Sequence, residues 1–167
     1  MKIHVHLILF LLFFCTQLHA DEEVAKFDLP IGKVNEANLT LEGAIKVTIR
    51  PGWHIYYKGP GDFGLPTSFD CKGNTSKIDI YWPTPKEHKD KIGRVTFVSN
   101  VYKDMVLFSF KMKVFPSRGY IDLNFRINYA ICKDRCIPKK AEIKVRQPLK
   151  NFVDSDASKL INEWYEK

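Results

Sequence analysis

Residues 120–146 read YIDLNFRINYAICKDRCIPKKAEIKVR. In the first half of this segment the apolar side chains fall on every second position: Ile121, Leu123, Phe125, Ile127, Tyr129 and Ile131. The second half alternates in the same way, and its apolar positions are Ala141, Ile143 and Val145. A period of two is typical of a strand with one buried face. The segment therefore predicts an antiparallel hairpin that turns at 133–135.

The register of this hairpin follows from the two alternating patterns. The expected cross-strand pairs are Leu123 with Val145, Phe125 with Ile143, Asp122 with Arg146, and Arg126 with Glu142. The apolar pairs share the buried face, and the oppositely charged pairs share the face toward water. A slip by one residue would place charges in the core, so the register is strongly specified.

Cys132 and Cys136 lie opposite each other at the inner ends of these strands. Pro138 lacks an amide hydrogen, so its pair with Ala130 should be of the non-hydrogen-bonded type. Alternation along the ladder gives the cysteines the same type of pair, with Cα atoms ~4.5 Å apart, which a disulfide can span. Both cysteines should lie on the face away from Phe125, and hence near the surface.

Two interpretations of this cysteine pair are open. A short-loop bond near the surface should be easier to reduce than a buried one, which favours reversible thiol–disulfide exchange. Nearby positive charge would favour the reactive thiolate, and the basic residues around the pair are Lys133, Arg135, Lys139 and Lys140. The alternative is a structural disulfide that ties the hairpin together in a binding module.

The rest of the chain is also rich in strand patterns. Short alternating runs separated by turn residues are expected at 38–50, 53–58, 67–71, 77–82, 94–101 and 105–115. Such spacing is typical of an all-β protein with an antiparallel β-sandwich. Segments 59–66 and 83–93 are expected to be connections between strands.

The last residues predict a short C-terminal helix. Asp154 or Ser155 is expected to cap it. Apolar residues follow with the spacing of one helix face: Ala157, Leu160, Ile161 and Trp164. This face should pack on the sandwich. We expect a β-sandwich domain at 21–150 and the packed helix at 151–167.

The first 20 residues have the layout of a cleaved signal peptide. Lys2 precedes an apolar run at 5–15, and Leu18-His19-Ala20 resembles a cleavage site. Cys15 would be discarded with this segment. The apolar run is short for a membrane span, and no later segment resembles one. We expect a periplasmic protein, or a secreted one if the source is not a Gram-negative bacterium.

Composition excludes several classes of function. The formal charge of +7 is moderate, and the lysines are spread along the chain, so no nucleic-acid partner is expected. The sequence has no Ser-His-Asp order, phosphate-binding loop or paired zinc motif, which excludes a hydrolase or nucleotide-binding role. No cofactor or metal is expected. A weaker alternative is copper handling, by His54, His88, Met105, Met112 and the cysteines.

Several motifs in order resemble one known family. They are PGWHIYY at 51–57, GPGDFGLP at 59–66, WPTP at 82–85 and CKDRCIP at 132–138. From about Asn38 to Val145 the chain is similar to the N-terminal periplasmic domain of the disulfide reductase DsbD and its relative ScsB. The resemblance implies an immunoglobulin-like sandwich and a component of a protein-disulfide reductase.

The resemblance also implies roles for particular residues. Cys132 and Cys136 would be the redox pair, and Cys136 would form the mixed disulfide with a partner. Tyr56 matches an aromatic position that flanks the pair. The family's covering loop would fall near 94–103, where Phe97 or Tyr102 would shield the disulfide.

The expected partners follow from the same resemblance. The pair would receive electrons from a membrane-embedded thiol/disulfide transporter and pass them to a periplasmic disulfide isomerase or another thiol protein. Full-length family members continue into membrane and thioredoxin-like domains, which this sequence lacks, so a separate donor is expected. Cys71 is an additional cysteine, and we expect it to be a buried bystander.

Overall fold

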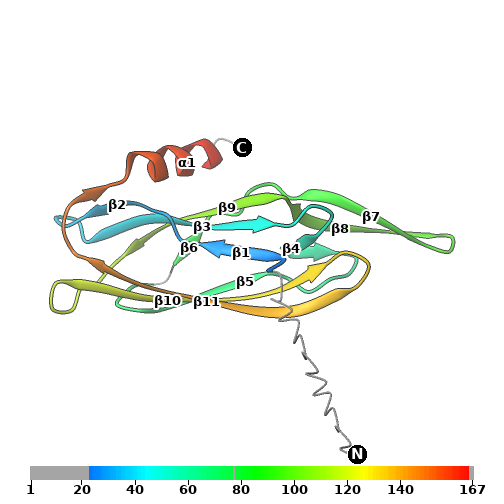
Figure 1. The fold of residues 1–167 in the computed structure, drawn as a ribbon, viewed down its shortest axis with the longest axis horizontal. Helices are drawn as coiled ribbons and strands as arrows, with labels where there is room; N and C mark the ends of the chain where they lie inside the picture. Colours follow the sequence, from blue (N-terminus) through cyan, green and yellow to red (C-terminus); the bar gives the residue numbers. More distant parts are fainter. Residues whose placement is uncertain (1–22, 77, 166–167) are drawn as a thin grey trace, which may run out of the picture.

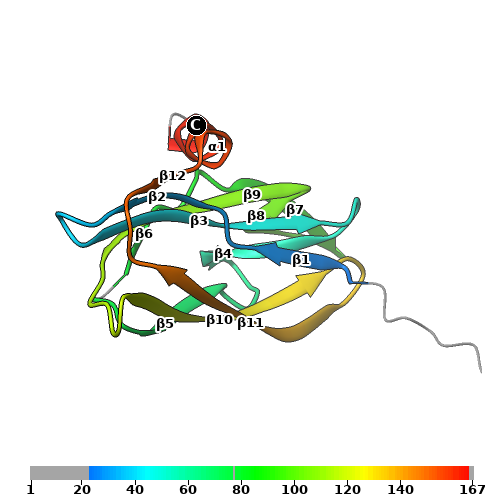
Figure 2. The same ribbon diagram turned by 60° about the vertical axis from the view of Figure 1, so that its left-hand side comes forward.

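The computed structural model describes residues 23–76 and 78–165, and within them two antiparallel sheets face each other as a sandwich (Figures 1 and 2). The first sheet has the strand order β12-β2-β3-β9-β6, and β1 also pairs with β3. Its strands are β1 (Ala25–Asp28), β2 (Ile31–Asn35), β3 (Thr40–Ile49), β6 (Asp79–Ile80), β9 (Met105–Lys113) and β12 (Phe152–Val153).

The second sheet carries the two cysteines that were predicted to pair. Its strand order is β11-β10-β4-β8-β7, and β5 also pairs with β10. Its strands are β4 (His54–Gly61), β5 (Ser68–Gly73), β7 (Lys86–Ile92), β8 (Val95–Lys103), β10 (Tyr120–Cys132) and β11 (Cys136–Pro148). The predicted immunoglobulin-like antiparallel β-sandwich is confirmed.

The core lies between the inner faces of the two sheets. Phe110 on β9 and Phe125 on β10 are buried, and their ring centroids are 5.2 Å apart across the sandwich. The other large buried side chains in this core include Leu41, Ile45, Val47, Ile55, Phe108, Ile121 and Ile127. Alternate residues of each strand supply this layer, as the period of two predicted.

The predicted hairpin register is also confirmed. Phe125 pairs with Ile143 and Arg126 pairs with Glu142 on β10 and β11. The same ladder continues without a shift from Tyr120 opposite Pro148 to Cys132 opposite Cys136. The turn therefore brings the two cysteines together from adjacent strand ends.

The strand β7 was not predicted, because segment 83–93 was expected to be a loop. It pairs with β8 along its whole length, from Lys86 opposite Val101 to Ile92 opposite Val95. The hairpin formed by β7 and β8 projects from one end of the sandwich (Figure 1). Most β7 side chains are exposed and charged, so the strand has no alternating apolar pattern. Lysines on an edge strand are a usual protection against pairing with other chains.

The predicted C-terminal helix is α1 (Ser155–Tyr165), on the outer face of the first sheet (Figure 2). The Asp154 carboxylate accepts hydrogen bonds from the amides of Asp156 and Ala157, at 3.0 and 2.9 Å. It is therefore the cap residue. Ile161 is buried in a small cluster with Ala44 and Leu107. No helix in residues 23–76 and 78–165 is long and apolar enough to cross a membrane. The predicted signal peptide, Cys15 included, lies outside the described residues.

Candidate functional site

Cys132 and Cys136 form a disulfide at the end of the β10–β11 hairpin. Their Cα atoms are 4.2 Å apart, close to the distance expected for a non-hydrogen-bonded antiparallel pair. Only three residues separate them, and all three are exposed. The bond therefore closes a very short loop on the surface of the second sheet.

The two cysteines differ sharply in exposure. Cys136 is exposed, whereas Cys132 is only 1% exposed and packs in a small apolar cluster with Tyr56, Val101 and Ala130. The prediction that both would lie near the surface is wrong for Cys132. Both do lie on the face of the sheet away from Phe125. The alternation of side chains along the strand predicts this face, but it does not show that side chains from other strands cover Cys132 there.

The cover comes from β4 and from the loop that follows it. Tyr56 is 1% exposed, and its ring packs under Gly64, where an added Cβ would lie 2.4 Å from a ring carbon. Gly64 also has a φ of +128°, a conformation that residues with a Cβ rarely adopt. A glycine at this position therefore lets the loop lie directly on the Tyr56 ring.

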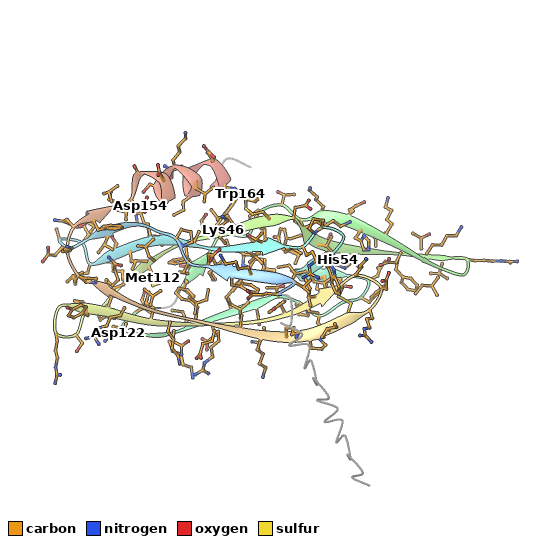
Figure 3. The ribbon with its side chains drawn as sticks, in the orientation of Figure 1. Lys46, His54, Met112, Asp122, Asp154 and Trp164 are labelled. Carbon is orange, nitrogen blue, oxygen red and sulfur yellow. A yellow bond between two sulfur atoms is a disulfide. The ribbon has the colours of Figure 1, made fainter. Side chains whose placement is uncertain are left out.

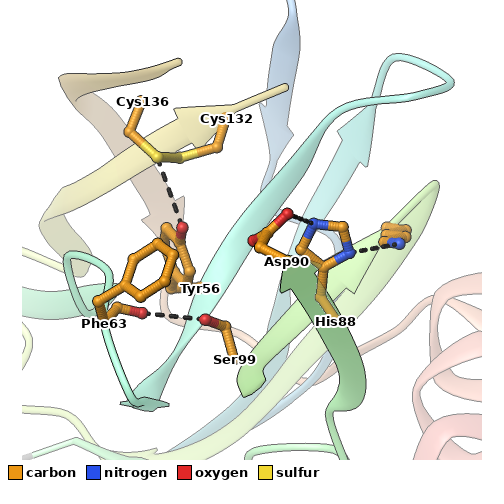
Figure 4. A network of polar contacts seen from close by, with 8 residues as sticks. Tyr56, Phe63, His88, Asp90, Ser99, Cys132 and Cys136 are labelled. Carbon is orange, nitrogen blue, oxygen red and sulfur yellow. Dashed lines mark hydrogen bonds and ion pairs between the residues drawn. A yellow bond between two sulfur atoms is a disulfide. The ribbon is translucent and has the colours of Figure 1, made fainter. Parts of the chain in front are cut away.

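The hydroxyl of Tyr56 lies 3.4 Å from the Sγ atom of Cys136 (Figure 4). Burial, and to a smaller extent the charge of Asp90, raises the pKa of Tyr56. The phenol is therefore neutral at physiological pH and can donate its proton to sulfur. Such a hydrogen bond favours a thiolate at Cys136 when the disulfide is reduced.

The loop after β4, residues 62–66, covers the Tyr56 ring and is anchored on β8. The Ser99 hydroxyl donates to the carbonyl of Phe63 at 3.1 Å, and the amide of Val98 donates to the Asp62 carboxylate at 2.7 Å. These bonds hold Phe63 beside Tyr56 (Figure 4). The Phe63 ring is 38% exposed and contacts the ring of Phe97, with centroids 5.2 Å apart.

The predicted flanking residues have different positions. Tyr56 lies at the disulfide, and Phe97 lies behind Phe63, one ring further away. Tyr102 points to the other face of β8, where its hydroxyl donates to the carbonyl of Pro83 and its ring contacts Phe108 in the core. The structure does not bring Tyr102 to the disulfide, because neighbouring residues of a strand alternate between faces.

Sequence reasoning missed Phe63. The segment near 94–103, where the resemblance implied a covering loop, is mostly strand β8, and its Val101 packs with Cys132. Phe63 lies in the GPGDFGLP motif, which contributes to the family resemblance and was expected to connect two strands, without a role for Phe63 itself. The glycines around a single aromatic residue were the available signal, because a loop that lies on a neighbouring ring needs residues without side chains.

A group of polar side chains lies next to the disulfide on the same outer face. His54 is 4% exposed, and its ring centroid is 4.6 Å from that of His88. His88 lies 3.3 Å from Lys103 through Nδ1 and 3.3 Å from Asp90 through Nε2. Figure 4 shows His88 and Asp90 near the cysteine pair.

The described residues include no group of three or more His, Cys, Asp or Glu side chains arranged to hold a metal ion. Met112, part of the copper alternative, is buried in the sandwich core and contacts the hydroxyl of Thr75. It lies far along the sandwich from His54 (Figure 3). The set of ligands considered for copper is therefore not brought together.

Cys71 is the free cysteine of the described residues. It lies on β5 opposite Phe125 of β10 and packs against the main core, far from the hairpin end. Burial, with a smaller contribution from Asp70, raises the pKa of its thiol to about 11. The thiol is therefore almost fully protonated at neutral pH.

We predict that Cys71 reacts slowly with thiol reagents in the folded protein. A pKa of about 11 in place of the usual 9.0 lowers the thiolate fraction, and so the rate, about 100-fold. Mass spectrometry after timed alkylation would measure it, with urea-unfolded protein as the control. Cys71→Ser should leave disulfide exchange unchanged. Rapid native labelling, or lost exchange in that variant, would make Cys71 a participant.

Comparisons with known proteins agree with this description. The model of the family "Thiol:disulfide interchange protein DsbD, N-terminal" matches residues 16–148. The N-terminal periplasmic domain of ScsB from Proteus mirabilis has a similar fold, with a TM-score of 0.68 and 21% identity. The alignment covers 89% of this chain but only 56% of that one, so this chain spans about half the length of the ScsB domain.

Two further comparisons add little. The reduced N-terminal domain of DsbD from Neisseria meningitidis aligns at 12% identity over 77% of this chain and 90% of that one, with a TM-score of 0.43. No curated protein sequence matched the chain.

Proposed function

Since the chain belongs to the family of DsbD N-terminal domains, we propose that it relays reducing equivalents to other proteins through a reversible Cys132–Cys136 disulfide. Membership of the family and the close cysteine pair fit thiol–disulfide exchange. The observation that carries the proposal is the unequal exposure of the two bonded sulfurs. One cysteine is open to a partner, and the other is buried directly behind it.

In this proposal each cysteine has a different role, and the asymmetry supports that division. In the reduced protein the Cys136 thiolate attacks a partner's disulfide and forms a mixed disulfide, and the partner's second sulfur leaves as a thiolate. The Cys132 thiol then loses its proton and attacks the Cys136 sulfur, which releases the partner's other sulfur. Two electrons pass to the partner, and the Cys132–Cys136 bond forms again.

The surroundings support this order of events. The Tyr56 hydroxyl, 3.4 Å from the Cys136 sulfur, can stabilise the attacking thiolate. Basic side chains close to the turn, Lys133 and Arg135 among them, favour the thiolate further. In this proposal the loop with Phe63 covers Tyr56, and through it the Cys132 side of the disulfide, and Phe97 supports the Phe63 ring.

The partners and location belong to the same proposal. The electron donor would be a separate membrane-embedded thiol/disulfide transporter, and the acceptor a periplasmic disulfide isomerase or another thiol protein. The protein would work in the periplasm after removal of residues 1–20, with residues 21–150 as the exchange domain. It would act as a component of a protein-disulfide reductase and need no cofactor of its own.

The reduction potential of the domain tests the proposal. We expect a value above about −300 mV, in the range of exchange catalysts, whereas structural disulfides of secreted proteins fall below it. The potential can be measured by equilibration with glutathione or dithiothreitol buffers. The Cys71→Ser variant should be used, so that the free thiol of Cys71 does not contribute to the measured thiol content. A potential below that threshold would support a structural disulfide in a binding module instead.

A further inference from the structure

His54 occupies an unusual position beside the redox pair. It lies directly across from Cys132 in the register between β4 and β10, and directly opposed residues on adjacent strands point to the same face. The side chain is 4% exposed. Its Nε2 atom has no hydrogen-bond partner among the residues that the structure describes. Buried polar atoms without a partner are rare, and a redox or catalytic role is one of the reasons for which proteins keep them.

The neighbours of His54 hold it without occupying that nitrogen. An ammonium group only donates, so Lys103 donates to Nδ1 of His88 at 3.3 Å. The proton of the His88 ring is then on Nε2, which faces Asp90 at 3.3 Å. Both His88 nitrogens are engaged, and its ring packs against His54. Tyr56 contacts His54 on the other side, with centroids 5.4 Å apart.

The resolving step of the proposed function needs a base at this place. Cys132 must lose its proton before its sulfur can attack, and its apolar neighbours disfavour a free thiolate. The cysteine is 1% exposed, so bulk water has little access to it. A proton acceptor in the protein is therefore required next to Cys132.

We propose that His54 is this acceptor. As the Cys132 sulfur attacks the mixed disulfide at Cys136, the Cys132 proton moves to Nε2 of His54, and the partner's sulfur leaves as a thiolate. The imidazolium then gives its proton to that thiolate or to water. In the reverse direction His54 returns a proton to the departing Cys132 sulfur. This inference rests on the proposed exchange function.

The electrostatics of the site suit this role. Burial, followed by the nearby His88 and Lys103, lowers the pKa of His54 from 6.5 to about 4, and Asp90 opposes the shift. The ring is therefore neutral at physiological pH, and with a pKa of about 4 it is a weak proton acceptor until negative charge develops at Cys132. A thiolate forming at Cys132 would raise the pKa of His54, so the transfer becomes easier as it proceeds. The titratable or charged groups that face His54 are Tyr56, Cys132, Lys103, His88 and Asp90.

The test separates the attacking step from the resolving step. Reduced Cys71→Ser protein is mixed with the aromatic disulfide 5,5′-dithiobis(2-nitrobenzoate), which releases one coloured thiolate when Cys136 attacks and a second when Cys132 resolves. We expect His54→Gln to leave the first phase within about twofold and to slow the second about 100-fold, the usual size of a general-base effect. His88→Gln, which keeps His54, should have a much smaller effect on the second phase.

The pH profile of the second phase gives a readout that a purely structural role would not change. In the parent protein the rate should be nearly flat from pH 6 to 8, since His54 is already deprotonated. In His54→Gln it should rise about tenfold per pH unit, because hydroxide becomes the acceptor. If His54→Gln does not fold, the pH dependence of the second phase in the parent protein is itself the test. A steep rise of that rate with pH would overturn the proposal. Two normal phases in a folded His54→Gln protein would also overturn it. Failure of the parent protein to react in either phase would instead refute the proposed exchange function.

Discussion

Cys132→Ala should capture partner proteins in stable mixed disulfides, and Cys136→Ala should capture almost none. The remaining Cys136 thiolate of the first variant is exposed, so it can attack a partner, but no second sulfur is left to release it. In the second variant the remaining cysteine is 1% exposed beneath Tyr56 and cannot be approached. Non-reducing electrophoresis after incubation with an oxidised periplasmic thiol protein would show the difference.

The double variant Cys132→Ala/Cys136→Ala is the control for folding. It should lose exchange completely and still unfold cooperatively, because both side chains point away from the main core that Phe125 fills. Loss of so short a closed loop should cost only about 2 kcal/mol. Equal capture by both single variants would refute the assignment of roles. No capture by either, with a low reduction potential, would leave the structural disulfide as the better interpretation.

The β10–β11 hairpin of the second sheet could be predicted from sequence, because the alternating residues that determine it lie within one short segment. Along β10 the buried face of Phe125 alternates strictly with the exposed face of Arg126, and β11 repeats the pattern. Only one register satisfies both strands, so the opposition of Cys132 and Cys136 followed without knowledge of the rest of the fold. The helix was predictable for a similar reason, since its cap and apolar face lie within one short segment.

The burial of Cys132 could not be predicted, because it depends on residues far away in sequence. Tyr56 and the loop with Gly64 cover it only once β4 pairs with β10. The same pairing brings His54 across from Cys132, and the pairing of β7 with β8 brings His88 to His54. The strand β7 was not predicted, because its residues are mostly charged and exposed and do not alternate with apolar residues.

The resemblance to the family predicted the position of Tyr56 correctly but not that of Tyr102. Tyr56 was placed at the disulfide through a motif with several matching residues. Tyr102 was placed there through a loose match, and a shift of one position along β8 moves a side chain to the opposite face. Val101, its neighbour, is the residue that lies in the apolar cluster with Cys132.

Phe125→Ala should destabilise the fold by about 3–5 kcal/mol, the usual cost of deleting a buried phenylalanine ring. The ring is fully buried and packs on Phe110 of the opposite sheet, so its loss would leave a cavity between the two layers. Phe115→Ala is the matched control, because that ring is 57% exposed, and it should change stability by less than about 0.5 kcal/mol. Urea unfolding followed by tryptophan fluorescence would measure both, with the slope m checked for constancy. A loss below about 1 kcal/mol for Phe125→Ala would mean that this ring does not join the two sheets.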